Sequence, residues 1–484
     1  MSDFDVIVIG SGIGGLVSAG LLTARGLRTL LIEKHISPGG YLSSFKRQGF
    51  VFDSAVDCIS GVAPGGIIYR VLELLEVEND IHFIRINPIR VSMFPGMKVV
   101  VAEDVNAYID NLSVLFPSEK QGIRNFFRTI STIFNGLQVF TNSIIAGSTG
   151  FGSITSDILK SINISYSGLL SEYISDHRLK AALSDRCPFI GLAPSKVSSA
   201  AMINLIMSYF RFGAYRAERR FQRLPEVLIS GIKKKGGRVI LGNGVKQILL
   251  DEHDCCTGVR CVNGDEYNAR HVISNADFNL TFRSFLGGKY SSVAEEMTRN
   301  PEISSSFFIV YAGVRGDAGP YSSSGYFPSY DMEEYFMPHM TFDERSTIGV
   351  TAASVEDRSR APQGCSTLVL HEMTEASGKK LDKPACTEKI IKKAEHFIPD
   401  IKSRVMVLDS ACPDTLERYT GNFRGAAFGW RQTPGFRGAR KHDIRNLYIA
   451  GHWGDMGDGV LAAAYSGARA AGEILVKEGI KDVV

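Results

Sequence analysis

Two short apolar runs near the start of the chain enclose a segment with the character of a helix. Val6 to Ile9 is continuously apolar, as expected for a strand that is buried on both faces of a sheet. A helix is predicted from about Gly14 to Arg25, with Gly26 placed to end it, and a second apolar run covers Thr29 to Ile32. The pattern predicts a strand, a helix and a second strand.

Alternating and apolar runs later in the chain predict further strands. Residues 236–277 alternate like short strands around a turn, and "NLYIAGHWGDMGDGVLAAAYSGARAAGEIL" has the pattern of a closing strand and a long helix. The runs "SSFFIVYAGV" and "CSTLVLHEM" are also strand-like and would form a second sheet.

The segment at about 120–145 has a helical stripe of apolar residues. Lys120, Arg124 and Arg128 line up beside this stripe at spacings of four. One hypothesis is that the helix docks on a membrane surface, and the alternative is that it packs within its own domain. The stripe consists of Ile123, Phe126, Phe127, Ile130, Ile133, Phe134, Leu137, Phe140 and Ile144.

Composition narrows the class of protein. The 484 residues should form two or three domains, and the net charge of +3 indicates no nucleic-acid partner. The eight cysteines contain no CxxC pair, so we expect no metal site. No signal segment precedes the first strand, and the uncharged stretch from Thr129 to Ser156 is too polar to span a membrane. We expect a cytoplasmic protein, with peripheral contact at the inner face of the membrane if the helix docks.

The first turn carries the strongest chemical signal. Gly10, Gly12 and Gly15 form G-x-G-x-x-G directly after a predicted strand. These glycines permit a tight turn, a close approach to a pyrophosphate and tight packing of helix on strand. Glu33, at the end of the second strand, could accept hydrogen bonds from ribose hydroxyls. The unit predicts a Rossmann-type dinucleotide-binding domain.

The residues that follow resemble the flavin-dependent amine oxidase and phytoene desaturase superfamily. Gly39 and Gly40 match its Gly-Gly pair, and Phe52 and Asp53 match a strand that ends in Phe-Asp. Tyr41 stands where many relatives have Arg. The resemblance implies that the dinucleotide is FAD, bound non-covalently.

Two later segments extend this resemblance over the whole chain. In the superfamily the equivalent of Val245 bonds adenine, Gly451 lies by the pyrophosphate and ribityl chain, and Gly459 with Val460 begins a helix facing the flavin. The resemblance and the motif together give these expected FAD contacts: Gly10, Ser11, Gly12, Ile13, Gly14, Gly15, Glu33, Lys34, Gly40, Tyr41, Val245, Gly451, His452, Gly459 and Val460.

The block "RYTGNFRGAAFGW" is similar to the branch of carotenoid desaturases, carotenoid isomerases and retinol saturases. This resemblance implies a discontinuous FAD domain, formed by residues 1–75, 223–290 and 410–484, with an inserted α+β substrate domain formed by residues 76–222 and 291–409. The chain is thus expected to be an α/β flavoprotein oxidoreductase.

The branch acts on lipophilic polyenes or isoprenoids. Its chemistry implies carbon–carbon desaturation by hydride transfer to flavin N5, with oxygen or a quinone as the electron acceptor. Isomerisation or saturation of a polyene stays open, as do a soluble amine oxidase and a non-enzymatic prenyl-lipid-binding escort protein. An NAD-dependent dehydrogenase is disfavoured because no second G-x-G-x-x-G follows a strand.

The sequence gives weaker signals for the residues of substrate binding and catalysis than for those of cofactor binding. Asp458 occupies a turn position that is Gly or Ala in relatives, so it could exchange a proton near the flavin or cap the last helix from a solvated loop. Two arginines replace a Gly-Gly pair and could bind an anionic substrate end. The candidate substrate residues are Tyr215, Arg219, Arg220 and Trp430.

Overall fold

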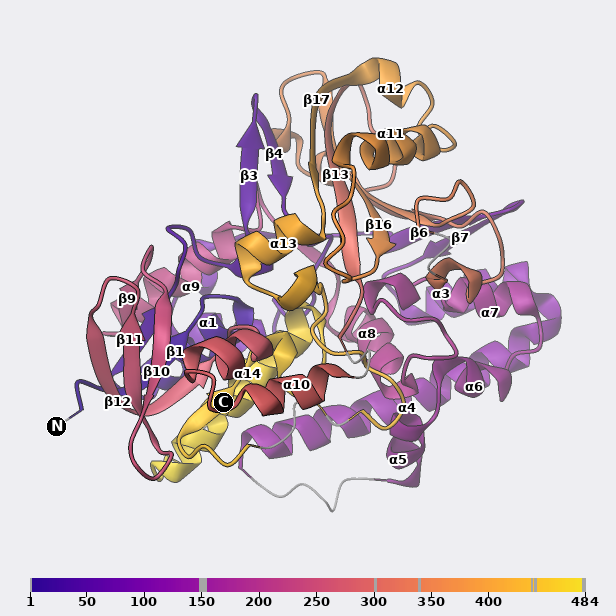
Figure 1. Cartoon of the computed structure of the whole chain (residues 1–484). Coiled ribbons are helices and arrows are strands. Elements are labelled where there is room, and N and C mark those ends of the chain that lie inside the picture. Colours follow the sequence, from indigo (N-terminus) through magenta and orange to yellow (C-terminus); the bar gives the residue numbers. More distant parts are fainter. Residues whose placement is uncertain are drawn as a thin grey trace.

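The computed structural model describes residues 2–147, 155–299, 303–337, 341–436, 438 and 442–480. Two seven-stranded sheets and a group of helices dominate these residues. In Figure 1 the first sheet lies on the left, the second sheet at the upper right, and the helices of residues 105–212 at the lower right.

The first sheet is built around five parallel strands in the order β18-β12-β1-β2-β9, and β11 and β10 extend it antiparallel from β12. All seven strands fall within the three segments assigned to the FAD domain, and the Rossmann-type α/β prediction is confirmed. The strands are β1 (Phe4–Ile9), β2 (Thr29–Ile32), β9 (Arg238–Ile240), β10 (Val245–Leu250), β11 (Cys256–Cys261), β12 (Glu266–Ser274) and β18 (Leu447–Ile449).

Helices cover this sheet closely because glycines remove side chains at their crossings. A Cβ atom on Gly467 would lie 2.0 Å from the carbonyl oxygen of Gly14, so these two positions bring the first and last helices into backbone contact. Gly26, with φ +84°, follows the first helix as predicted. The helices are α1 (Ile13–Ala24), α2 (Ile67–Leu74), α9 (Arg223–Lys234) and α14 (Gly459–Lys477).

The second sheet has the order β17-β13-β16-β15-β14-β6-β7. The predicted strands "SSFFIVYAGV" and "CSTLVLHEM" become β13 and β16, which pair antiparallel. Alternate residues of β13 face opposite sides: Phe308 and Val310 pack with α11, while Phe307 and Ile309 face the other side. The elements are β6 (Arg90–Phe94), β7 (Met97–Val101), β13 (Ser306–Arg315), β14 (Ser323–Tyr326), β15 (Ile348–Thr351), β16 (Cys365–Thr374), β17 (Val405–Ala411), α11 (Lys383–Ala394) and α12 (Ile401–Arg404).

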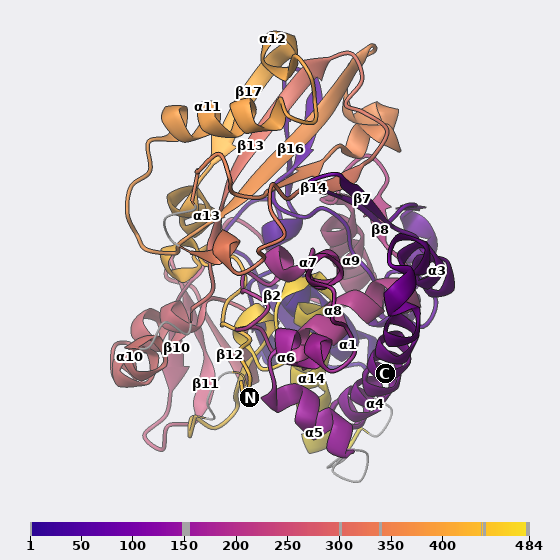
Figure 2. The same cartoon turned by 90° about the vertical axis from the view of Figure 1, so that its right-hand side faces the viewer.

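The third part is a helical group made by the first insert (Figure 2). Its helices are α3 (Val105–Leu115), α4 (Lys120–Ile145), α5 (Ser156–Asn163), α6 (Tyr166–Ser171), α7 (His177–Leu183) and α8 (Ser199–Phe212). The remaining elements are the strand pairs β3 (Ser44–Arg47) with β4 (Phe50–Asp53) and β5 (Phe83–Arg85) with β8 (Tyr215–Ala217), and helices α10 (Ser291–Arg299) and α13 (Pro413–Thr420).

The apolar stripe of α4 belongs to the core of this group. It packs against α3, α5, α8 and α14, which corrects the docking hypothesis: the face proposed for a membrane is covered by the protein itself. Among the described residues, no helix combines the length and apolar character needed to cross a membrane. Phe140 and Ile144 are half-buried, whereas the buried members are Ile123, Phe126, Phe127, Ile130, Ile133, Phe134 and Leu137.

Candidate active site

A cavity of about 540 Å³ lies where the two sheets meet the helical group. We call its two regions the glycine part and the second-sheet part. The glycine part is lined by the β1–α1 turn, Gly40, Gly451 and the start of α14. The second-sheet part is lined by side chains of β13, β15 and β16 together with Arg90, Phe189, Leu205 and Tyr209.

Most of the expected FAD contacts line this cavity. Ser11 and Gly15 lie behind the lining instead: a Cβ atom on Gly15 would be 2.0 Å from the Gly10 carbonyl oxygen, so this glycine serves helix packing. The expected contacts that line the cavity are Gly10, Gly12, Ile13, Gly14, Glu33, Lys34, Gly40, Tyr41, Val245, Gly451, His452, Gly459 and Val460.

Glu33 is fixed by the first turn. One of its carboxylate oxygens accepts hydrogen bonds from the Ser11 amide at 2.8 Å and the Ser11 hydroxyl at 2.7 Å. The other accepts from the His35 amide at 2.9 Å. Ser11 thereby orients the acidic side chain at the cavity wall, where a ribose would meet it.

Asn275 is a cavity residue that sequence reasoning did not single out. Three glycines surround its side chain. A Cβ atom built on Gly12 would lie 2.9 Å from Asn275 Nδ2, and Cβ atoms built on Gly14 and Gly451 would lie 2.6 Å and 2.4 Å from Asn275 Oδ1. The backbone N–H of Asn275 also donates a hydrogen bond to the carbonyl of Ile9 at 2.9 Å, which fixes this residue at the end of β1. Its place in "VISNAD", directly after β12, was the only available signal.

Two helices begin at the cavity without a side-chain cap. Gly12, which has no side chain, is the N-cap of α1, and the side chain of Asp458, the N-cap of α14, accepts no hydrogen bond from the first helical turn. The first N–H groups of a helix have no intrahelical partner and favour negative charge. The glycine cradle around Asn275 and these open helix ends fit a pyrophosphate-containing dinucleotide.

A polar cluster joins the glycine part to the rest of the cavity. Asn422 donates to the Tyr41 hydroxyl at 3.1 Å and accepts from the Trp453 indole at 2.9 Å, and His452 Nε2 lies 3.4 Å from the same amide oxygen. Burial raises the pKa of Tyr41 to about 12 and lowers the pKa of His452 to about 4. Both rings are therefore neutral near pH 7, so they offer hydrogen bonds and not charge.

Asp458 does not act as a solvated cap, which corrects one of the two sequence-based interpretations. One carboxylate oxygen accepts from the Gln432 amide, while the other is buried and has no hydrogen-bond partner among the described residues. Burial raises the pKa of this carboxyl well above its usual range. Its neighbours Gly459 and Val460 line the cavity, whereas Asp458 lies just behind them.

The four candidate substrate residues lie outside the described cavity lining, so we withdraw that assignment. Tyr215 lies in β8, and Trp430 is buried and donates from its indole to the Trp453 carbonyl at 2.9 Å. Arg220 forms a half-exposed ion pair with Glu226 at 2.9 Å. Arg219 is exposed. The adjacency of Arg219 and Arg220 in the sequence did not show whether their side chains face the cavity.

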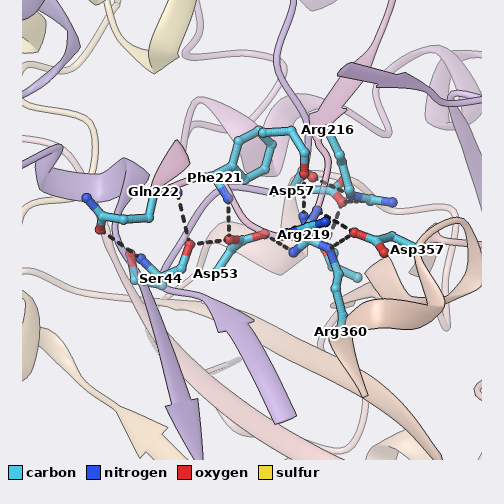
Figure 3. Close-up of polar contacts among 12 residues, drawn as sticks. Ser44, Asp53, Asp57, Arg216, Arg219, Phe221, Gln222, Asp357 and Arg360 are labelled. Atoms are coloured by element: carbon cyan, nitrogen blue, oxygen red, sulfur yellow. Dashed lines mark hydrogen bonds and ion pairs between the residues drawn. The ribbon is translucent and has the colours of Figure 1, made fainter. Parts of the chain in front are cut away.

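Buried ion pairs instead connect Asp53 and Asp57 to arginines from distant parts of the chain (Figure 3). Arg360, which is 1% exposed, pairs with Asp53 at 2.5 Å and lies 3.4 Å from Asp357. It also donates to the Ala217 carbonyl at 2.8 Å. Asp53 had been noted only as part of a family match, and its partner comes from more than three hundred residues away.

A second buried pair stands beside the first (Figure 3). Arg216 contacts Asp57 at 2.5 Å and Glu356 at 2.7 Å, and Asp57 also accepts from the hydroxyls of Ser323 and Thr351. Burial alone would raise the pKa of Asp57, but Arg216 and these hydroxyls hold it below its usual value. Asp57 therefore lines the cavity as a paired carboxylate.

Apolar and aromatic side chains line much of the second-sheet part, beside polar ones such as Arg90, Thr367 and Glu372. Phe307, Ile309 and Val369 line it from β13 and β16. His371 also lines it and packs edge-on to the ring of Phe307, and burial lowers the pKa of this histidine to about 4. Such walls suit an extended hydrocarbon chain.

Known proteins similar to this chain agree with these features. The family model for an NAD(P)-binding Rossmann-like domain matches residues 8–75. Prolycopene isomerase 1 of an Oncidium hybrid cultivar is 26% identical over 99% of this chain and 85% of its own length. All-trans-retinol 13,14-reductase of Danio rerio is 25% identical over 99% of this chain and 87% of its own. This chain is a relative of carotenoid isomerases, retinol reductases and carotenoid desaturases.

A carotenoid desaturase completes that set. The 4,4'-diapophytoene desaturase of a Methylomonas species is 22% identical over 97% of this chain and 94% of its own length. The resemblance drawn from the sequence motifs, and with it the prediction of an enzyme, are confirmed.

Solved structures agree in fold. An oxidoreductase from Methanosarcina mazei has a TM-score of 0.67 at 18% identity, covering 96% of this chain and 98% of its own. Putrescine oxidase has a TM-score of 0.65 at 14% identity, covering 98% and 99%. At such identities these similarities establish the shared architecture and leave the substrate to the site itself.

Proposed function

We propose that the chain is an FAD-dependent oxidoreductase that acts on a lipophilic polyene or isoprenoid chain and introduces a carbon–carbon double bond. The observation that carries this proposal is the continuity of the cavity from a glycine-lined turn to walls of Phe307, Ile309 and Val369. A dinucleotide in the first region and a hydrocarbon in the second would meet inside one cavity.

The glycine part supports FAD as the cofactor. Gly12, Gly14 and Gly451 leave the backbone open, and the uncapped start of α1 favours the pyrophosphate. Glu33 is oriented for ribose hydroxyls, and the uncapped start of α14 would favour negative charge on the ring system. Bound FAD would supply hydride transfer.

The chain's own residues would position the substrate and keep water out. Apolar side chains of β13 and β16 would hold a hydrocarbon without competing hydrogen bonds, and would bring a C–H bond into a fixed orientation. Tyr41 and His452, both uncharged near pH 7, would complete the polar rim at the junction of the two parts. The relatives that act on carotenoids and retinol support this substrate class.

Isomerisation of a polyene is a second candidate, favoured by a specific observation. Prolycopene isomerase 1 is 26% identical to this chain over 99% of it, whereas the diapophytoene desaturase is 22% identical over 97%. The same cavity and cofactor would serve, but no electron acceptor would be consumed.

Product analysis separates the two. The purified protein is first checked for a flavin spectrum and then incubated with a cis-configured carotene under air, with a quinone, or anaerobically without an acceptor. Products that lack two hydrogens and appear only with an acceptor would support desaturation. An all-trans product of unchanged mass without an acceptor would support isomerisation. Absence of flavin, or no change in any of the incubations of either the carotene or a polyene acid run in parallel, would contradict the proposal.

A further inference from the structure

Arg90 is a buried cation that lines the second-sheet part of the cavity, and two of its guanidinium nitrogens lack a hydrogen-bond partner among the described residues. It lies at the start of β6 and is 2% exposed. Its Nε and Nη1 atoms have no hydrogen-bond partner among the residues that the structure describes. Leaving such donors unpaired in a protein interior is costly, so an acceptor is expected beside them.

The carboxylates nearest to Arg90 also serve other partners. Its nearest carboxylate is Asp185, at 3.7 Å from Nε, which also accepts from the Ser92 hydroxyl and stabilises the second buried guanidinium, Arg186. Arg90 and Arg186 thus share Asp185, while Asp57, which also attracts Arg90, makes its direct contact with Arg216. Burial and then Arg186 lower the pKa of Arg90 to about 10, so it stays charged near neutral pH.

The fold makes room for this guanidinium. A Cβ atom on Gly325 would lie 2.2 Å from Arg90 Nη2, so a larger residue at this point of β14 would have to displace the guanidinium. The Arg90 guanidinium also stacks on Phe189, with 5.0 Å between its central carbon and the ring centroid. Backbone and aromatic ring hold the cation in place at the cavity wall.

We infer that Arg90 receives a carboxylate at one end of the substrate, so that the substrate is a polyene or isoprenoid acid and not a pure hydrocarbon. A carboxylate would accept strong, charge-assisted hydrogen bonds from the guanidinium donors that lack a partner among the described residues. The apolar walls of β13 and β16 would hold the chain between this carboxylate and the glycine part. This inference rests on the proposed function, because it names the end group of the same substrate.

Binding to the purified holoprotein tests the inference without turnover. All-trans-retinoic acid and its uncharged methyl ester are titrated separately, and the dissociation constants are read from quenching of tryptophan fluorescence, since Trp453 lines the cavity. We expect the wild-type protein to prefer the acid. Arg90→Met should reduce that preference by about ten- to a hundredfold, the range for a charge-assisted hydrogen bond.

Three further variants test whether the position and charge of the Arg90 guanidinium cause the preference for the acid. Arg90→Lys should retain part of the preference, and Gly325→Ala should weaken acid binding by displacing the guanidinium while keeping its charge. Arg178→Met is the control, because Arg178 is half-exposed, pairs with Asp176 at 3.0 Å and should leave the preference unchanged.

The outcomes are separable. Equal or better binding of the ester by the wild-type protein would overturn the inference while leaving the proposed function intact. Binding of neither compound would contradict both. If Arg90→Met does not fold, the wild-type preference and the Gly325→Ala variant still decide.

Discussion

The two parts of the cavity are built in different ways. The glycine part is formed by backbone, with six glycines (Gly10, Gly12, Gly14, Gly40, Gly451 and Gly459) in its lining and Asn275 between three of them. The second-sheet part is formed by side chains, including buried pairs such as Asp53 with Arg360 and Asp57 with Arg216. A local motif specifies the first, whereas the second needs residues brought together from distant segments.

This difference predicts different failures on mutation. In the glycine part, a larger side chain would block the ligand, while the packing of the surrounding strands would be unchanged. In the second-sheet part, removal of one charge leaves its partner buried and unpaired, which destabilises the whole fold. Mutations that separate ligand loss from stability loss therefore sharpen the comparison.

The largest effect is expected from Gly12→Val. A Cβ atom here lies 2.9 Å from Asn275 Nδ2, and the two further methyl groups would occupy the pyrophosphate position. We expect colourless protein with nearly all flavin lost, and a free energy of unfolding close to that of flavin-stripped wild-type protein. Absorption spectra and denaturant unfolding give both values. Yellow protein with normal flavin occupancy would overturn the assignment of the glycine part.

A large loss of stability is expected from Arg360→Met. Removal of this buried guanidinium leaves Asp53 and Asp357 without their cation, and such a change costs about 3–5 kcal/mol of unfolding free energy. The matched control is Arg220→Met, which breaks a half-exposed pair with Glu226 and should cost less than about 1 kcal/mol. Equal losses from the two variants in urea unfolding would contradict the comparison.

Acid stability tests His371. The pKa of His371 is about 4 in the folded protein and lies below the ordinary 6.5. Between these two pH values the imidazole is therefore protonated in the unfolded chain and neutral in the folded protein. Stability should be fully present above about pH 6.5 and fall towards pH 4. His371→Gln should reduce this loss by up to about 3 kcal/mol. Unfolding free energies of both proteins across this range give the answer, and parallel curves would contradict it.

The sequence predicted the first sheet better than the second-sheet part of the cavity. The β1–α1–β2 unit was predicted to within about two residues because buried parallel strands and glycine turns have local signatures. The burial of the α4 stripe was not decided by its periodicity, since a membrane-docking helix and a core helix share the same pattern.

The cavity residues that sequence reasoning missed lack any local signature. Arg90 and His371 lie on ordinary-looking strands, and their importance comes from partners far along the chain. Conversely, Arg219 and Arg220 were conspicuous as neighbours, yet the chain turns them away from the cavity. Spacing along the chain shows local geometry, but pairing across domains is set only by the tertiary fold.

The smallest effect is expected from Arg219→Gly. Arg219 has φ +68°, in the left-handed region where a side chain costs about 1 kcal/mol, and its backbone amide donates to Asp357 at 2.5 Å. Glycine would relieve the strain and keep this hydrogen bond, although it also loosens the unfolded chain. Arg219→Ala is the control, because it removes the same charge and retains the strained φ. We expect the glycine variant to exceed the alanine variant by up to about 1 kcal/mol in unfolding free energy, with retinoic acid binding unchanged in both. A glycine variant less stable than the alanine variant would contradict the expected relief of backbone strain at this turn. Weaker retinoic acid binding by either variant would restore Arg219 as a substrate contact.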